Sequence, residues 1–145
     1  AFAASLLFSI KANPDFPTLF ALKRVQEKFF LKLKSNPETR VDLMSNLLNS
    51  RLEELQSVFD HKSYNYILPA ASRYSTLAGQ ITDLVVVNNL TGKVDTIKNQ
   101  FLDHQEIIEK IYVAYPKNTD NVEYKYIKDD YNYLGLYLDQ LAKVK

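Results

Sequence analysis

The sequence has no cysteine and no tryptophan, and only three glycines, five prolines and one methionine occur among its 145 residues. Without cysteine, disulfides and thiolate chemistry are excluded. This absence does not assign a compartment, because a domain that buries enough apolar surface is stable without disulfides. Glycine and proline interrupt helices, so their scarcity favours long helices joined by short turns.

An excess of charge of either sign is also missing. The 18 basic and 17 acidic side chains give a formal net charge of +1. Nucleic-acid binders usually concentrate lysine and arginine, so we expect no nucleic-acid partner. The content of 46% hydrophobic and 24% charged residues is typical of a globular protein. A chain of this length is sufficient for one domain with a real core.

Long hydrophobic runs are absent as well, apart from the short apolar segment AFAASLLFSI at residues 1–10. It is far shorter than the roughly 20 residues that span a bilayer. Three interpretations are open: the end of a signal or anchor segment, the start of a mature chain, or a segment packed on the core. Residues 11–145 are expected to form the domain itself.

Apolar side chains recur at steps of three and four residues through most of the chain, which predicts an all-α, single-domain bundle of about five helices. No stretch alternates with the period of a strand. The helices are expected over residues 18–34, from Pro37 through Phe59, from about Pro69 to Asn88, between Thr91 and Pro116, and from Asp120 through Leu141.

Several local features refine this prediction. Asn36 before Pro37 is a typical helix start, and Asp120 with Glu123 resembles a capping box. Gly135 lies inside the last helix at a cost of about 1 kcal/mol, which suggests the close approach of another backbone. Arg51 and Glu54 are expected to pair on an outer face, since residues three apart are neighbours on a helix.

The first expected helix, residues 18–34, combines an apolar face with several lysines. We favour a helix of the bundle whose lysines are solvated, because this pattern is common to amphipathic helices and Glu27 interrupts the basic face. Proximity of the basic face to anionic lipid headgroups is the alternative.

Two stretches share a pattern with a known family. The first is Pro17, Phe20, the run Leu22-Lys23-Arg24 and Glu27; the second is Pro37-Glu38, Arg40 and the run RLEEL at 51–55. Over roughly residues 10–90 the chain resembles the bacterial domain of unknown function 5667. Members of that family usually follow a signal or membrane-anchor segment, so the resemblance implies an extracytoplasmic helical domain. It supplies no catalytic residue to transfer.

The two histidines offer little chemistry by their positions. His61 is expected at a helix end, where its side chain satisfies a terminal carbonyl. His104 falls on the apolar seam of the fourth helix, with isoleucine at positions 107 and 108. A metal site on one helix face needs a second ligand three or four residues away, so we favour a hydrogen-bonded core histidine.

Adjacent carboxylates occur at Glu53-Glu54 and Asp129-Asp130. Neighbours on a helix diverge by about 100°, so neither pair converges on a substrate and both are expected to face solvent. Phosphate-binding glycine loops, zinc-ligand spacings and the nucleophile elbow of hydrolases are missing from the sequence. We therefore expect no enzyme activity, and no catalytic, cofactor-binding or metal-binding residue.

Tyrosine is the unusual component, with ten copies, six of them between Tyr112 and Tyr133. Tyr126, Tyr133 and Tyr137 form a second stripe on the last helix. One interpretation is a core wall whose hydroxyls reach the edge of the bundle; the other is a surface that binds a partner. The second depends on these rings being exposed to solvent.

These observations lead to two functional hypotheses. The first is a non-enzymatic extracytoplasmic module, membrane-anchored or secreted, that binds another protein or assembles with itself through Tyr126, Tyr133 and Tyr137. The second is a carrier of a small apolar ligand, whose cavity would be edged by tyrosine hydroxyls and His104. The residues expected around that cavity are His104, Tyr112 and Tyr115.

Overall fold

The computed structural model describes residues 36–117 and 122–145, and these residues form helices and short connections without any β-strand. The all-α prediction is confirmed for this part of the chain. Its four α-helices are α3 (Pro37–Asp60), α4 (Ile67–Val87), α5 (Val94–Ala114) and α6 (Tyr124–Leu141). Short 3-10 helices at Tyr64–Tyr66 and Thr91–Lys93 precede α4 and α5. The sequence predicted about five helices, but the one expected over residues 18–34 lies outside the described residues.

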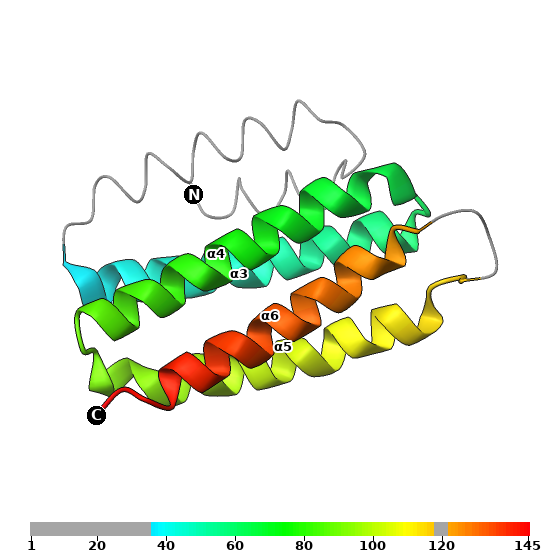
Figure 1. The fold of residues 1–145 in the computed structure, drawn as a ribbon. Helices are drawn as coiled ribbons and strands as arrows, with labels where there is room; N and C mark the ends of the chain where they lie inside the picture. The colour runs from blue at the N-terminus through cyan, green and yellow to red at the C-terminus, as the bar shows by residue number, and fades with distance from the viewer. Residues whose placement is uncertain (1–35, 118–121) are drawn as a thin grey trace.

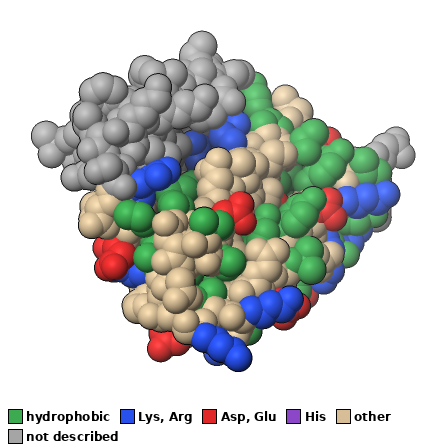
Figure 2. Space-filling view, turned by 60° about the vertical axis from the view of Figure 1, so that its left-hand side comes forward, with side chains coloured by type: hydrophobic (Ala, Val, Ile, Leu, Met, Phe, Trp, Pro, Cys, Tyr) green, Lys and Arg blue, Asp and Glu red, His purple; other side chains and the backbone are tan. Residues whose placement is uncertain are grey.

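The four helices lie side by side along much of their length (Figure 1). Helix α4 packs against both α3 and α6, while α5 packs mainly against α6. Helix α4 is therefore the common packing partner of α3 and α6. On the face drawn in Figure 2, basic and acidic side chains are interspersed with apolar ones.

The predicted apolar stripes supply the core. Fully buried side chains include Leu48 and Leu55 of α3, Ile81 of α4, Phe101 of α5 and Leu134 of α6. Each such side chain contributes about 1.5–3 kcal/mol by leaving water. A few predicted stripe positions are only half-buried and lie at the margin of the core; these are Phe59, Leu84, Val94, Tyr131 and Leu138.

Helix ends show how local sequence sets the boundaries. The Oδ1 atom of Asn36 accepts hydrogen bonds from the backbone N–H groups of Glu38 at 2.9 Å and Thr39 at 3.3 Å, which confirms the predicted cap. Helix α4 begins at Ile67, earlier than predicted, and Pro69 lies in its first turn, where a missing N–H group costs nothing. Asp120 lies outside the described residues, and Glu123 precedes α6 instead of lying in its first turn.

His61 ends α3 as the sequence predicted. Its Nδ1 atom lies 2.8 Å from the backbone oxygen of Ser57, to which it donates a hydrogen bond. The side chain thus satisfies one of the carbonyl groups that the end of a helix leaves without an internal partner.

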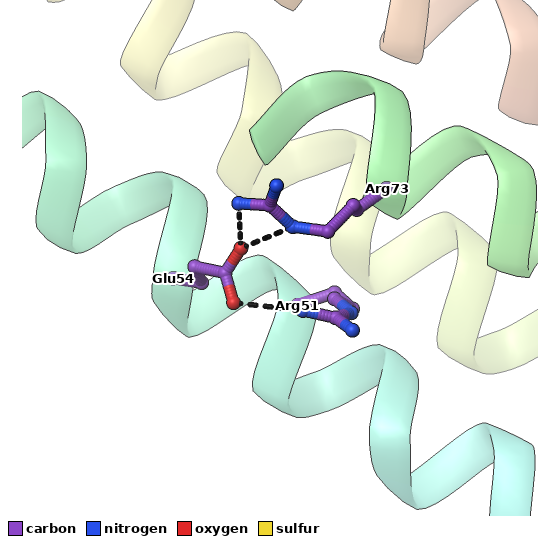
Figure 3. A network of polar contacts seen from close by, with 3 residues as sticks. All are labelled: Arg51, Glu54 and Arg73. Carbon is purple, nitrogen blue, oxygen red and sulfur yellow. Dashed lines mark hydrogen bonds and ion pairs between the residues drawn. The ribbon is translucent and has the colours of Figure 1, made fainter. Parts of the chain in front are cut away.

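Arg51 and Glu54 do pair, but the predicted outer face was wrong because both side chains are buried, with Glu54 0% exposed. Figure 3 shows Glu54 between two arginines: Arg51 Nη1 lies 2.9 Å from Oε2, and Arg73 Nε of α4 lies 2.8 Å from Oε1. The turn of about 100° per residue sends Glu53 to solvent and Glu54 towards α4. The ion pair between Arg73 and Glu54 therefore ties α3 to α4.

The close approach expected at Gly135 was also wrong. A Cβ atom added there would meet only the Gln105 side chain, at 3.7 Å. Close approach occurs instead at Gly79 of α4, where a Cβ atom would stand 2.9 Å from the hydroxyl oxygen of Tyr137. The absence of a side chain at Gly79 thus lets Tyr137 of α6 lie against α4.

Replacing Glu54 by alanine is expected to lower the free energy of unfolding by about 3–5 kcal/mol, because Arg51 and Arg73 lose their shared carboxylate inside the protein. Glu53→Ala is the matched control, and as a change at an exposed position it should stay within about 0.5 kcal/mol of the parent. Urea unfolding followed by circular dichroism measures both. Equal effects of the two substitutions would contradict the structural role of Glu54.

Candidate functional site: a pocket between α4 and α6

The three predicted surface tyrosines all lie on α6, with different exposures. Tyr133 is 44% exposed, whereas Tyr126 and Tyr137 are half-buried. The rings of Tyr133 and Tyr137 stack with centroids 6.2 Å apart and planes within 14°. Tyr137 donates a hydrogen bond from its hydroxyl to the backbone oxygen of Ser75 at 3.4 Å, so it is turned towards α4. The most accessible ring of the three is that of Tyr133.

Tyr126 and Tyr133 line a pocket of about 290 Å³ between α4 and α6. Helix α4 contributes Leu68, Ala71, Ser72, Ser75 and Thr76, and α6 contributes Tyr126, Asp129, Asp130 and Tyr133. The lining therefore offers hydroxyl groups on one side and two carboxyl groups with two phenol rings on the other. None of these nine residues carries a positive charge.

Asp130 is the residue that gives this pocket its chemical character. It is only 2% exposed, and its Oδ2 atom has no hydrogen-bond partner within the described structure. Burial, and secondarily the charge of Asp129, raise the pKa of Asp130 to about 9, while a hydrogen bond with the Ser75 side chain acts in the opposite direction. The carboxyl group is therefore protonated at neutral pH.

The prediction that Asp129 and Asp130 both face solvent was wrong for Asp130. The sequence does contain a signal for its burial, because Asp130 stands between Ile127 and Leu134 at steps of three and four on the aliphatic seam. Glu54 likewise lies four residues before the buried Val58 on α3. Reading only the pairs of adjacent acids misses this periodicity.

His104 lies inside the core, 5% exposed, as the hydrogen-bonded histidine that the sequence favoured. Its Nδ1 atom lies 2.8 Å from the Tyr74 hydroxyl, and its Nε2 atom lies 2.9 Å from Asn49 Oδ1. Asn49 Oδ1 is an acceptor, which also receives an N–H of Gln100 at 3.0 Å. Nε2 therefore carries the proton, and Nδ1 accepts a hydrogen bond from the Tyr74 hydroxyl.

Burial lowers the pKa of His104 to about 4, although the charge of Asp103 acts in the opposite direction. The ring is neutral at physiological pH, in keeping with its one donor and one acceptor nitrogen. Between about pH 4 and the usual histidine range near 6.5, the unfolded chain binds a proton that the folded protein does not bind. This residue therefore lowers stability as the pH falls through that window.

Tyr74 is the member of this hydrogen-bond network that interacts electrostatically with Asp130. Burial, and then the charge of Asp130, raise the pKa of the Tyr74 hydroxyl well above its usual value. The hydroxyl therefore keeps its proton and its hydrogen bond to His104. The core network of α3, α4 and α5 thus ends next to the carboxyl group of α6.

The residues expected around a ligand cavity do not come together as one lining. Tyr112 and Tyr115 belong to an aromatic cluster near the end of α5, with ring centroids 6.3 and 6.1 Å from that of Tyr124. Lys117 Nζ lies 4.3 Å from the centroid of the Tyr112 ring. His104 contacts Tyr74 instead, so the carrier hypothesis stays a prediction without a described cavity around these three residues.

A second pocket, of about 360 Å³, lies between α3 and α4 and is lined by residues that include Arg40, Met44 and Asp83. It holds charges of both signs. Neither pocket is lined by His104, Tyr112 or Tyr115.

No group of three or more histidine, aspartate or glutamate side chains in residues 36–117 and 122–145 is arranged to hold a metal ion. Across the same residues, every helix is too short or too polar to serve as a membrane span.

Comparison with known families gives a match over residues 13–118 to the domain of unknown function DUF5667, which covers more than half of the chain. The chain belongs to the DUF5667 family. This confirms the resemblance found in the sequence and extends it through α5. No curated protein and no solved structure matches the chain. In the pocket, α4 lies within the part matched to DUF5667, whereas α6 lies beyond it.

Replacing Asp130 by asparagine is expected to remove a pH dependence of stability. Between about pH 4 and pH 9 the folded protein holds the Asp130 proton and the unfolded chain does not, so the stability of the parent falls as pH rises through this window. Asparagine does not titrate. The stability of Asp130→Asn relative to the parent should therefore increase with pH, by at most about 1.4 kcal/mol per unit.

Urea unfolding at a series of pH values measures this difference, with Asp129→Asn at the exposed neighbour as the control. The control should follow the parent much more closely. A constant difference between Asp130→Asn and the parent from pH 5 to pH 8 would show that Asp130 is ionised in the folded protein.

Proposed function

We propose that this DUF5667 chain is a non-enzymatic interaction module that binds a basic segment of another protein on the face formed by α4 and α6. The observation that carries the proposal is the pocket between these helices, in which the buried carboxyl group of Asp130 lies beside the partly exposed rings of Tyr126 and Tyr133. The partner is expected to present lysine or arginine.

The apolar part of this face supports a protein partner. Leu68 lines the pocket and is 43% exposed, and Tyr133 next to it is 44% exposed. Tyrosine combines a large apolar ring with a polar tip and loses little conformational freedom on binding, which explains its frequency at the centres of protein interfaces.

The charge of the face supports a basic segment. The pocket lining includes two acidic residues and no basic one. Elsewhere the protein already places its own lysines against tyrosine: Lys117 Nζ lies 4.3 Å from the centroid of Tyr112, and Lys128 Nζ lies 4.6 Å from that of Tyr131. In the pocket, the rings of Tyr126 and Tyr133 line the same wall as the carboxyl group of Asp130. A lysine or arginine of another protein would meet both kinds of group there.

A binding role is more consistent with the buried polar residues than catalysis. Both ring nitrogens of His104 are hydrogen-bonded to Tyr74 and Asn49, and both carboxylate oxygens of Glu54 contact arginine. These groups stabilise the fold and are not directed at a substrate.

The proposal also places the domain outside the cytoplasm, membrane-anchored or secreted. It is supported by the apolar character of residues 1–10 and by the resemblance to a family whose members usually follow a signal or anchor segment. Protease added to intact cells of the source organism should degrade the protein while a cytoplasmic marker survives. Protection until the cells are lysed would contradict an exposed location.

The docking face is tested by placing a photo-crosslinking phenylalanine analogue at position 133 of the full chain in its source organism. The expected product is a covalent complex with another protein, joined through a segment that contains lysine or arginine. A synthetic peptide of that segment should bind the purified chain. Tyr133→Ala should weaken this binding by about 10-fold or more, as expected for a central interface residue.

Leu136→Ala is the control, since it truncates an exposed apolar side chain of the same helix that does not line the pocket. It should change the affinity of the peptide much less. Crosslinks only to a second copy of this chain would replace the proposal by self-assembly. A segment without basic residues, or equal effects of the two substitutions, would contradict it.

A further inference from the structure

We propose that the pocket between α4 and α6 binds the cationic head of a lysine or arginine side chain, with the carboxylate of Asp130 as its counter-ion. This inference rests on the proposed function, because it names the chemical group by which the partner is anchored. It also assigns a ligand class to the pocket that is testable without the partner.

Asp130 has unmet hydrogen-bonding capacity. The residue lines the pocket and is 2% exposed, and its Oδ2 atom is buried without a partner among the described residues. Polar atoms removed from water are nearly always hydrogen-bonded in folded proteins. A ligand that donates an N–H group to Oδ2 would complete this site.

The walls of the pocket are suited to a cation. Tyr126 and Tyr133 border the pocket, and the faces of tyrosine rings attract ammonium and guanidinium groups. Asp129 adds a negative charge at the rim, where it is exposed. A volume of about 290 Å³ is sufficient for a single side-chain head with its attached methylene groups.

The surroundings of Asp130 determine where its proton lies. Among the described residues, the titratable groups that interact with this carboxyl are the neutral Tyr74 of α4, which is bonded to His104 of α5, and Asp129 and Tyr137 of α6. None of them is a cation, so these surroundings favour the protonated acid. When a cation binds, Asp130 releases its proton to the solvent. The protonated acid and the cation thus give an ion pair and one released proton.

The experiment titrates the full chain with N-acetyl-arginine amide and, in parallel, with N-acetyl-citrulline amide, which has nearly the same shape but no charge. N-acetyl-lysine amide is the second cationic probe. Binding is followed by calorimetry and by NMR. We expect both cations to bind and citrulline to bind at least about 10-fold more weakly, because it cannot form the ion pair.

The variants identify the counter-ion. Asp130→Asn should weaken binding of the arginine probe by about 10-fold or more, whereas Asp129→Asn at the exposed rim should have a smaller effect. Asparagine removes the titrating group without removing the side chain, and we expect this variant to be at least as stable as the parent. Circular dichroism checks that it is folded.

The pH dependence identifies the released proton. Between pH 6 and pH 8 the affinity for the arginine probe should increase by nearly 10-fold per unit, because more of Asp130 is ionised beforehand. The binding heat should differ between phosphate and Tris buffers, because the buffer takes up about one proton that Asp130 releases on binding. In Asp130→Asn both effects should disappear.

Several results would overturn the inference: equal binding of the arginine and citrulline probes, unchanged affinity of Asp130→Asn, or no binding of either cation up to its solubility limit. If the probes fail while the crosslinked peptide binds through Tyr133, the docking face stands and the cation site is wrong. If the probes bind and position 133 yields no partner, the cation site stands and the proposed function is wrong.

Discussion

A carboxyl group that folding removes from water must either meet a positive charge or keep its proton, and this constraint orders the interior of the described structure. Glu54 meets two arginines, one from its own helix and one from α4, and the ion pair with Arg73 ties α3 to α4. Among the described residues Asp130 meets no cation, and it stays protonated between α4 and α6. The first arrangement is complete within the fold, whereas the second leaves the buried Oδ2 atom without a hydrogen-bond partner among the described residues.

Helix α4 connects these two arrangements. It supplies Arg73 to the ion pair with α3, Tyr74 to the hydrogen bond with His104 of α5, and Ser75 to the carboxyl group of α6. These three consecutive residues point in different directions because each step along the helix turns by about 100°. A pocket built on such a helix is held in place by the core contacts of its neighbours, which limits how far its walls move when a ligand enters.

The predictions from the sequence succeeded where one helix contains all the required information. Asn36, Pro37 and His61 act on backbone groups a few residues away, so their roles follow from sequence spacing and are confirmed. The apolar stripes were predicted by the same periodicity. The environments of Glu54 and Asp130 were predicted wrongly, because adjacent acids were taken to face solvent when the steps of three and four placed one of each pair on the core side.

The sequence by itself determined that this is an all-α member of the DUF5667 family, since helix periodicity, caps and family motifs are all local patterns along the chain. The tertiary structure decided which polar residues meet. Arg73 reaches Glu54 and Tyr74 reaches His104 only because α4 packs against α3 and α6 in one particular rotation. The pocket at Asp130 has the same origin: its walls come from two helices far apart in the sequence, whose relative rotation is fixed by side-chain packing across the whole core.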